Sequence, residues 1–292
     1  IIICFVACSR SHTKLVSRTS MHSQSQSQYQ LNKAILKATW NGSITEIQSL
    51  LDRHADVNAL ARYHYRPLHL ATSKSHHQCV ELLLDRHADI NAGDKGRSTP
   101  LHYASSRGHH QCVELLLDRN ANANARNWSR NTPLHHASIY GRPQCMALLL
   151  DRHADIHAHN SSSSLPLHLA SSKGHHQCVE LLLDRHADIN AFGRHTYRPL
   201  HVAAENGHHQ CVELLLDRHA DPDAFGRHAY RPLHLASLKG HHRCIELLID
   251  HGADKSPRDV RHCVPPLSRS IAQYLACISH ANVSPSLSRS SC

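Results

Sequence analysis

Seven prolines recur at intervals of 33 residues, and this spacing constrains the fold more than any other feature of the chain. They are Pro67, Pro100, Pro133, Pro166, Pro199, Pro232 and Pro265, and the first six each open the phrase Pro-Leu-His-x-Ala. A fixed period of this length indicates a stack of one supersecondary unit, in which each unit contacts its neighbours. Such a stack is not one globule built around one site, so the repeat favours binding over catalysis.

One unit, residues 66–92, predicts two short helices. Pro67 suits the first turn of a helix, where its missing N–H costs no hydrogen bond. This helix should end near Ser75, where the other units have glycine, which accepts the left-handed backbone of a helix end. A second helix is expected from about His77 to Asp85. Both helices are shorter than the ~12–15 residues that a helix needs to stand alone in water, so each must pack against neighbouring units.

The phrases Thr99-Pro-Leu-His102 and Thr132-Pro-Leu-His135 resemble the ankyrin repeat, as do the Ala-Asp-Ile-Asn runs at 88–91 and 187–190. The resemblance implies an all-α solenoid of stacked helix-turn-helix units, with finger loops between them. In that family the threonine and the histidine bond to the backbone around the turn. The threonine is replaced here by Arg66, Arg198, Arg231 and Leu165. The replacements call those local bonds into question, but not the fold.

The repeat divides the chain into three parts. Residues 1–30 form a Ser- and Gln-rich leader that we predict to be disordered. Seven ankyrin repeats follow over residues 31–260: an N-terminal cap repeat, 31–62, and then 63–95, 96–128, 129–161, 162–194, 195–227 and 228–260. Residues 261–292 are predicted to be a degenerate C-terminal cap helix and a disordered tail. Atypical end repeats are expected because their outer faces meet water.

Six of the 11 cysteines also recur at the repeat period: Cys79, Cys112, Cys145, Cys178, Cys211 and Cys244. Stacked helices lie about 8–10 Å apart, whereas a disulfide needs its Cα atoms within about 7 Å. We therefore expect buried free thiols and a reducing compartment, the cytoplasm with the nucleus as the alternative.

The 32 histidines invite metal and catalytic interpretations, and neither fits. Five doubled histidines at the repeat period, such as His76-His77, are followed four residues on by an acid such as Glu81, which could make half of a metal site. Zinc needs three or four ligands, and the next unit's side chains lie about one helix spacing too far away. No nucleophile recurs beside the Pro-Leu-His histidines, to which the resemblance assigns a structural bond. We expect no metal, no cofactor, no small-molecule substrate and no enzymatic activity.

Charge is partitioned between two parts of each unit. Of the 23 acidic residues, 18 fall in three columns that repeat the positions of Glu81, Asp85 and Asp89. The seven residues before each of the first six repeat prolines, which we call the finger, carry ten basic residues in all and a single acid, Asp94. The six fingers are 60–66, 93–99, 126–132, 159–165, 192–198 and 225–231. The resemblance implies that fingers and first helices line a concave groove and that second helices form the back. We therefore expect a positive groove and a negative back on a chain of formal net charge +9.

Arginine and aromatic residues are enriched at binding hot spots, and both kinds occur in the fingers and at the ends of the first helices. The predicted partner-binding residues are Arg62, Tyr65, Arg66, Lys74, Arg97, Arg107, Trp128, Arg130, Tyr140, Lys173, Phe192, Arg194, Tyr197, Arg198, Phe225, Arg227, Tyr230, Arg231 and Lys239.

Asn58, Asn91 and Asn190 are candidate hydroxylation sites. Each ends a phrase that resembles the ankyrin segment modified by the oxygen-sensing asparaginyl hydroxylase. The alternative interpretation is a turn residue that bonds its own backbone.

These observations predict a protein-interaction scaffold or adaptor that binds an acidic protein segment in the groove, because positive potential selects negative partners. The alternative is a substrate-receptor subunit of a ubiquitin ligase. It rests on residues 263–277, whose Pro265-Pro-Leu phrase faintly resembles the end of a suppressor-of-cytokine-signalling box. A third class, nucleic-acid or phosphoinositide binding, rests on positive charge alone and is not favoured. No segment is long enough to span a membrane.

Overall fold

The computed structural model describes residues 26–254, and this part of the chain contains helices, turns and loops but no strand. Residues 26–41 are helical, and α2 (Ile44–Asp52) follows. First helices of seven or eight residues then alternate with second helices of nine. The first helices are α3 (Pro67–Ser73), α5 (Pro100–Arg107), α7 (Pro133–Ile139), α9 (Pro166–Lys173), α11 (Pro199–Glu205) and α13 (Pro232–Lys239). The second helices are α4 (His77–Asp85), α6 (His110–Asp118), α8 (Pro143–Asp151), α10 (His176–Asp184), α12 (His209–Asp217) and α14 (His242–Asp250).

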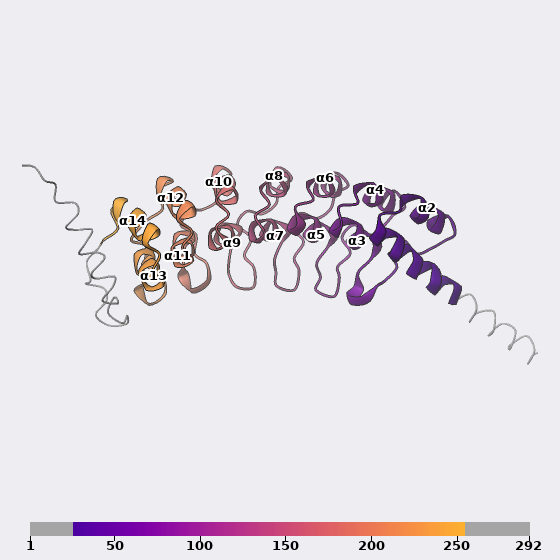
Figure 1. Ribbon diagram of the computed structural model, residues 1–292, viewed down its shortest axis with the longest axis horizontal. Helices are drawn as coiled ribbons and strands as arrows, with labels where there is room; N and C mark the ends of the chain where they lie inside the picture. Colours follow the sequence, from indigo (N-terminus) through magenta and orange to yellow (C-terminus); the bar gives the residue numbers. More distant parts are fainter. Residues whose placement is uncertain (1–25, 255–292) are drawn as a thin grey trace, which may run out of the picture. The chain divides into compact units, whose positions relative to one another are not determined.

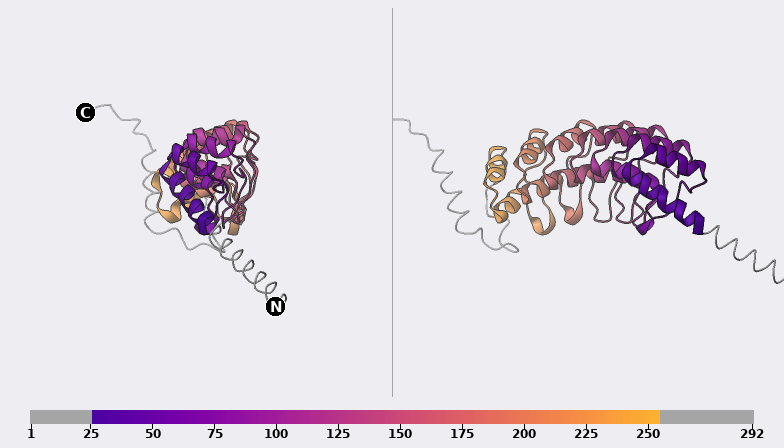
Figure 2. Two further views of the ribbon diagram at one scale, coloured as in Figure 1. Left: turned by 90° about the vertical axis from the view of Figure 1, so that its right-hand side faces the viewer. Right: turned by 45° about the vertical axis from the view of Figure 1, so that its right-hand side comes forward.

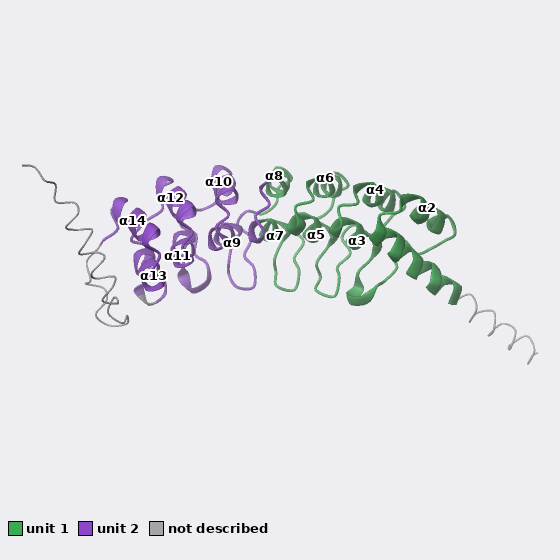
Figure 3. Cartoon of the chain, viewed as in Figure 1, with its two compact units in different colours: residues 1–137, 144–155 green, residues 138–143, 156–292 purple. Residues whose placement is uncertain are grey.

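The chain divides into two compact units, residues 1–137 with 144–155 and residues 138–143 with 156–292 (Figure 3). Within unit 1, α3 packs beside α5, and α4 packs between α2 and α6. Within unit 2, α11 packs between α9 and α13, and α12 packs between α10 and α14. In each unit the first and second helices form two rows, and the long loops leave from the side of the first helices (Figures 1 and 2). The predicted all-α repeat fold is confirmed.

The first helices begin and end as the sequence predicts. The residue before each proline is extended at α3, α5, α9, α11 and α13, and proline occupies the first turn. The helices α5, α9 and α13 end at glycines with left-handed backbone, Gly108, Gly174 and Gly240. Ser75, which replaces glycine after α3, takes the same left-handed form with φ of 63°.

The core lies between the two rows of helices. In unit 1, Leu101 and Ala104 of α5 and Val113 and Leu116 of α6 are completely buried or nearly so. Burial of one such leucine contributes roughly 1.5–3 kcal/mol, which two short helices could not gain in isolation. The six periodic cysteines are buried and free, as predicted. Burial raises the pKa of the Cys178 thiol to about 11 and that of Cys211 to about 12.

Neighbouring repeats of unit 2 are also joined by the first histidine of a doubled pair. The ring Nε2–H of His208 donates to the carbonyl of Ser172 at 3.0 Å, and that of His241 donates to Glu205 at 3.0 Å. A Cβ atom placed on Gly174 would come within 2.5 Å of the His208 ring. Glycine is therefore required at position 174 for two reasons. Its φ of +75° disfavours other residues, and the histidine of the next repeat leaves no room for a Cβ atom.

The predicted boundary of the leader needs one change. Residues 26–30, assigned above to a disordered leader, belong to the helical segment 26–41, and Gln28 bonds to Asn32 and to the carbonyl of His54 in the first repeat. The rest of that leader and the predicted cap helix and tail at 261–292 lie outside the described residues.

Candidate functional site

Each finger is a short loop closed on itself by a main-chain hydrogen bond. In unit 1 the bond runs from Asp94 N–H to the Ser98 carbonyl at 3.0 Å in the second finger, and from Asn127 N–H to Asn131 at 3.1 Å in the third. In unit 2 it runs from Gly193 N–H to Tyr197 at 2.8 Å. Three of the fingers contain a single 3₁₀ turn, η1 (Arg62–His64), η2 (Arg194–Thr196) or η3 (Arg227–Ala229).

The Pro-Leu-His histidines fasten the fingers to the helices. The ring Nε2–H of His69 donates to the Ser98 carbonyl in the next finger at 3.1 Å, and that of His102 donates to Asn131 at 3.0 Å. His168 and His201 make the equivalent bonds to Tyr197 and Tyr230 in unit 2, at 3.0 and 3.1 Å. The Nδ1 atoms of His69, His102 and His201 each accept from a main-chain N–H, and a histidine that donates at Nε2 and accepts at Nδ1 is neutral.

Burial keeps these rings neutral. Desolvation lowers the pKa of His102, His168 and His201 to about 4, and it also lowers the pKa of His69. These side chains are structural, as the resemblance implied. The rings of His69, His102 and His201 are bonded at both nitrogens, so they have no free nitrogen to offer to a substrate.

The bonds at the threonine position change with the residue that occupies it. At Thr99 both the main-chain N–H and the hydroxyl reach the Nδ1 of His102, at 3.1 and 2.8 Å. At Arg66, Arg198 and Arg231 the main-chain N–H still donates to the histidine, at 3.1–3.2 Å, and only the hydroxyl bond is lost. At Leu165 the Nδ1 of His168 has no hydrogen-bond partner.

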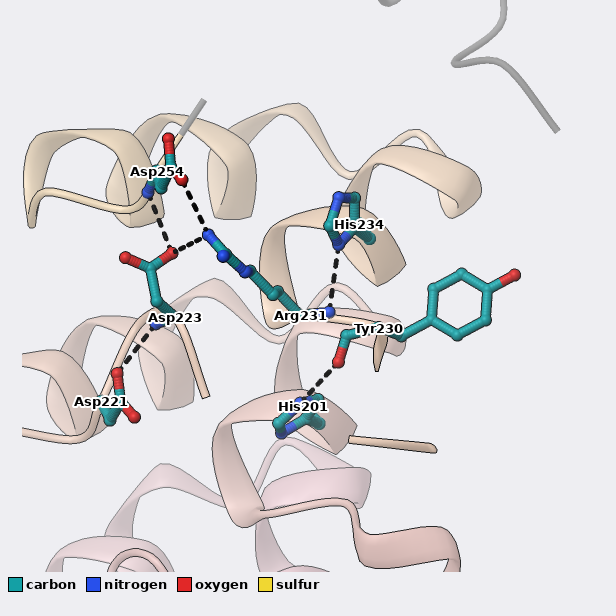
Figure 4. Close-up of polar contacts among 7 residues, drawn as sticks. All are labelled: His201, Asp221, Asp223, Tyr230, Arg231, His234 and Asp254. Carbon is teal, nitrogen blue, oxygen red and sulfur yellow. Dashed lines mark hydrogen bonds and ion pairs between the residues drawn. The ribbon is translucent and has the colours of Figure 1, made fainter. Parts of the chain in front are cut away.

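Three of the predicted partner-binding arginines turn inward and are held by aspartates. Arg231 is buried, and its guanidinium bonds Asp223 and Asp254 at 3.1 Å each (Figure 4). Arg198 pairs with Asp221 at 3.3 Å, and Arg66 pairs with Asp89 at 3.5 Å.

Asp89, Asp221 and Asp254 each lie 23 residues after the arginine with which they pair, in the turn that follows the next second helix. Asp223 lies eight residues before Arg231. The guanidiniums of Arg198 and Arg231 also lie over the rings of Phe192 and Phe225, at 5.3 and 4.9 Å from the centroids. Arg198 and Arg231 clasp their repeats to the preceding ones through Asn190 and Asp223. Arg66 pairs within its own repeat, and none of the three charges is free for a partner.

The other predicted cations are exposed on the fingers and at the ends of the first helices. They are Arg62, Lys74, Arg97, Arg107, Arg130, Lys173, Arg194, Arg227 and Lys239. Trp128 is 71% exposed, and Phe192, Phe225 and Tyr140 are more than half exposed. Tyr65, Tyr197 and Tyr230 are half-buried against histidine rings, with Tyr197 stacked on His201 at 5.3 Å.

Asp94, the only acid in the fingers, is satisfied internally. Its Oδ1 accepts from the N–H groups of Gly96 and Ser98 at 2.8 and 2.7 Å, and its Oδ2 accepts from the Tyr103 hydroxyl at 2.6 Å. Burial and this carboxylate together raise the pKa of Tyr103. The carboxylate is occupied in shaping its own finger, and its single negative charge stands against the ten basic residues of the six fingers.

The second helices carry less net negative charge than their acidic columns suggest, because an arginine column pairs with one of those columns. In unit 1, Arg86 pairs with Asp52 at 3.0 Å and Arg119 pairs with Asp85 at 2.8 Å. Arg218 pairs with Asp184 at 2.8 Å in unit 2. Of the other two acidic columns, Asp89, Asp221 and Asp254 pair with finger arginines, whereas the glutamate column includes the exposed Glu180 and Glu213.

The asparagine candidates lie in the turns that follow the second helices. The side-chain oxygen of Asn58 accepts from Asp89 N–H at 2.9 Å, and that of Asn91 accepts from Asn122 N–H at 2.9 Å, so each bridges to the next repeat. That of Asn190 accepts from Arg198 at 3.4 Å. As for metal ions, residues 26–254 contain no group of three potential ligands.

One aromatic residue was missed by the sequence analysis. Trp40 is 50% exposed near the end of the helical segment 26–41, and the ammonium of Lys74 lies 3.9 Å from its ring centroid. Its position at the end of the first helix of the cap repeat was the available signal. Lys74 thus already has an aromatic partner.

Comparison with known families agrees with the repeat pattern. The family model described as ankyrin repeats, in three copies, matches residues 4–94, 93–160, 124–193 and 167–259. No curated protein matches the chain at a significant level. Within residues 26–254, none of the helices has both the length and the apolar character needed to cross a membrane.

Proposed function

The chain belongs to the ankyrin repeat family, whose members generally mediate protein–protein interaction, and we propose that it is a scaffold or adaptor for an acidic protein segment. The segment would bind in a basic, aromatic-bearing groove lined by the fingers and the first helices. The observation that carries the proposal is which charged residues of the fingers already have partners within the protein. The exposed cations have no carboxylate partner among the described residues, whereas the one finger acid, Asp94, is internally bonded.

Differences between the repeats support the same assignment. The second helices α4, α6, α10 and α12 have the identical sequence HQCVELLLD, so they present the same surface in each repeat. The fingers differ from repeat to repeat in charge and in aromatic content. A surface that distinguishes one partner from another needs such variation, which favours the fingers over the second helices as the source of specificity.

The structure narrows the predicted binding set. We propose that Arg62, Arg97, Arg130, Arg194 and Arg227 contact the partner, with Trp128, Phe192 and Phe225 as apolar contacts. Arg66, Arg198 and Arg231 are left out of this set because aspartates of the chain already pair with them. Cations at the rim of an interface chiefly raise the association rate and confer salt dependence, so we expect salt-sensitive binding.

The test is affinity capture of partners by the full chain and by two charge-reversed variants, Arg97→Glu with Arg130→Glu and Arg194→Glu with Arg227→Glu. At least one variant should lose the captured protein or retain it only at low salt. The matched control is Glu180→Lys with Glu213→Lys, which changes two exposed charges on second helices. If the control loses the partner as readily as both finger variants, the finger assignment is wrong.

The ubiquitin-ligase alternative remains a prediction, because residues 263–277 lie outside the described residues. It predicts that the chain co-purifies with elongin and cullin and that deletion of these residues abolishes that association. Hydroxylation of Asn58, Asn91 and Asn190 likewise remains a proposal, and mass spectrometry of the protein purified from cells would detect the added oxygen.

A further inference from the structure

Unit 1 carries three consecutive fingers whose tips are joined to one another. Lys95 N–H in the second finger donates to the Tyr63 carbonyl of the first at 2.8 Å. Trp128 N–H in the third donates to the Gly96 carbonyl at 2.9 Å, and the Trp128 indole N–H donates to the Lys95 carbonyl at 2.9 Å. These bonds link the three loops, and a partner would not need to order each of them separately.

The same tips hold residues other than glycine in the left-handed backbone region. Tyr63 has φ of 59°, Arg97 of 60° and Arg130 of 54°. Such residues each cost on the order of 1 kcal/mol or more, and they persist where the surrounding contacts fix them, often at binding sites. Arg97 and Arg130 occupy the same position in neighbouring repeats, so they present their cations in the same way one repeat apart.

Trp128 gives these tips an apolar centre. Its ring is 71% exposed although its only polar atom is bonded to Lys95, so it offers a partner ring surface and no hydrogen bond. Lys95, Arg97, Arg126 and Arg130 are exposed on the same two fingers and pair with no carboxylate among residues 26–254. An indole ring held in place and surrounded by cations is suited to bind an apolar side chain that is flanked by acidic residues.

We propose that these three fingertips bind an extended acidic peptide that places one apolar side chain on Trp128 and carries an acidic residue at about every third position. This inference rests on the proposed function and specifies its partner. Neighbouring repeats lie about 10 Å apart, and an extended chain advances about 3.3 Å per residue. Carboxylates three residues apart would therefore face Arg97 and Arg130.

A peptide fits this surface better than a single-stranded nucleic acid does. Stacking platforms for single strands hold successive bases on aromatic rings, and the bases along a strand are about 3.4 Å apart. The exposed rings here, Tyr63 and Trp128, lie on the first and third fingers, with Gly93-Asp-Lys-Gly96 and no aromatic residue on the finger between them. Only a chain with widely spaced side chains would use both rings.

The experiment uses the full chain with Trp40→Phe, which leaves Trp128 as the single tryptophan reporter. The probe is a synthetic peptide of about ten residues, long enough to span three repeats when extended, with glutamate at every third position and one phenylalanine beside the central glutamate. Titration should change the tryptophan fluorescence and give a saturable binding curve. The same peptide with glutamine for glutamate should bind at least tenfold more weakly.

Two substitutions separate the apolar anchor from the charges. Trp128→Ala should weaken binding at least tenfold when followed by the anisotropy of a labelled peptide, whereas Trp128→Phe should retain most of the affinity. Arg97→Asn with Arg130→Asn should weaken binding to a similar degree, because asparagine tolerates the left-handed backbone but carries no charge. Thermal melts of each variant verify that the loss is not unfolding.

Several results would overturn the inference. The inference is wrong if Trp128→Ala binds the peptide as tightly as the wild-type chain does. It is also wrong if the glutamine peptide binds as tightly as the glutamate peptide, or if a single-stranded oligonucleotide binds more tightly than either peptide. Its failure can be distinguished from failure of the proposed function. If a captured partner depends on Arg194 and Arg227 but not on Trp128, the scaffold function stands and this site is wrong.

Discussion

At the scale of single residues, similar arginines have different roles. Arg227 and Arg231 lie in the same finger, four residues apart, yet Arg227 is exposed and Arg231 is among the buried residues. Arg231 is held there by two aspartates and by the ring of Phe225. A buried cation is tolerated only when it is paired, so the aspartates and the arginine depend on one another.

This difference predicts that Arg231→Ala destabilises the protein by about 1–3 kcal/mol, because it leaves Asp223 and Asp254 near each other without a cation. Arg227→Ala, the matched control, should change stability by less than about 0.5 kcal/mol. Arg231→Thr should recover part of the loss, since a threonine hydroxyl bonds the histidine ring at Thr99. Urea denaturation measures all three. Equal effects of Arg231→Ala and Arg227→Ala would mean that the clasp contributes nothing.

At the scale of elements, repeats are joined where a first helix ends against the next second helix. Gly174 and Gly240 share a left-handed backbone. Of these two glycines, Gly174 faces the histidine of the following repeat, whereas Gly240 faces no atom of the described residues within 4 Å. Gly174→Ala should therefore lower the free energy of unfolding more than Gly240→Ala does. For Gly240→Ala we expect a loss of roughly 1–2 kcal/mol, which comes from the left-handed backbone alone. Combining Gly174→Ala with His208→Ala should bring its cost back toward that of Gly240→Ala. Chemical denaturation of these three variants and of His208→Ala alone measures the difference, and equal costs for the two glycines would contradict the packing argument.

Most of the fold could be predicted at this scale because each signal is local. Proline in the first turn, glycine at the helix end and apolar residues at helical spacing all act within about ten residues, and the 33-residue period then repeats them. The candidate site was less predictable. Whether Arg198 or Arg231 faces solvent depends on an aspartate 23 residues further on, Asp221 or Asp254, and a composition count of the fingers carries no such information. The Arg119–Asp85 pair was missed for the same reason.

At the scale of the whole molecule, buried histidines couple stability to pH. His69, His102, His168 and His201 each bond to a neighbouring finger as neutral rings, and burial lowers the pKa of the last three from 6.5 to about 4. His136 has a pKa lowered to about 4 by burial as well. Because the unfolded chain binds protons more readily than the folded one, the contribution of each ring is fully present above pH 6.5. It is lost as the pH falls from 6.5 toward about 4, at about 1.4 kcal/mol per pH unit and ring within that window.

The prediction is that the melting temperature falls steeply between about pH 6.5 and 5. Several rings titrate together, and a loss of a few kcal/mol is a large part of a typical folding free energy. Thermal melts at about pH 7.5, 6.5 and 5.5 test this expectation. His201→Gln should lower the melting temperature at neutral pH yet reduce its further drop in acid, because one titrating group has been removed. The matched control, His176→Gln with His209→Gln, replaces two exposed rings and should leave both the stability and its slope nearly unchanged. If the control flattens the slope as much as His201→Gln does, charge repulsion among surface histidines drives the acid transition, and the buried rings do not.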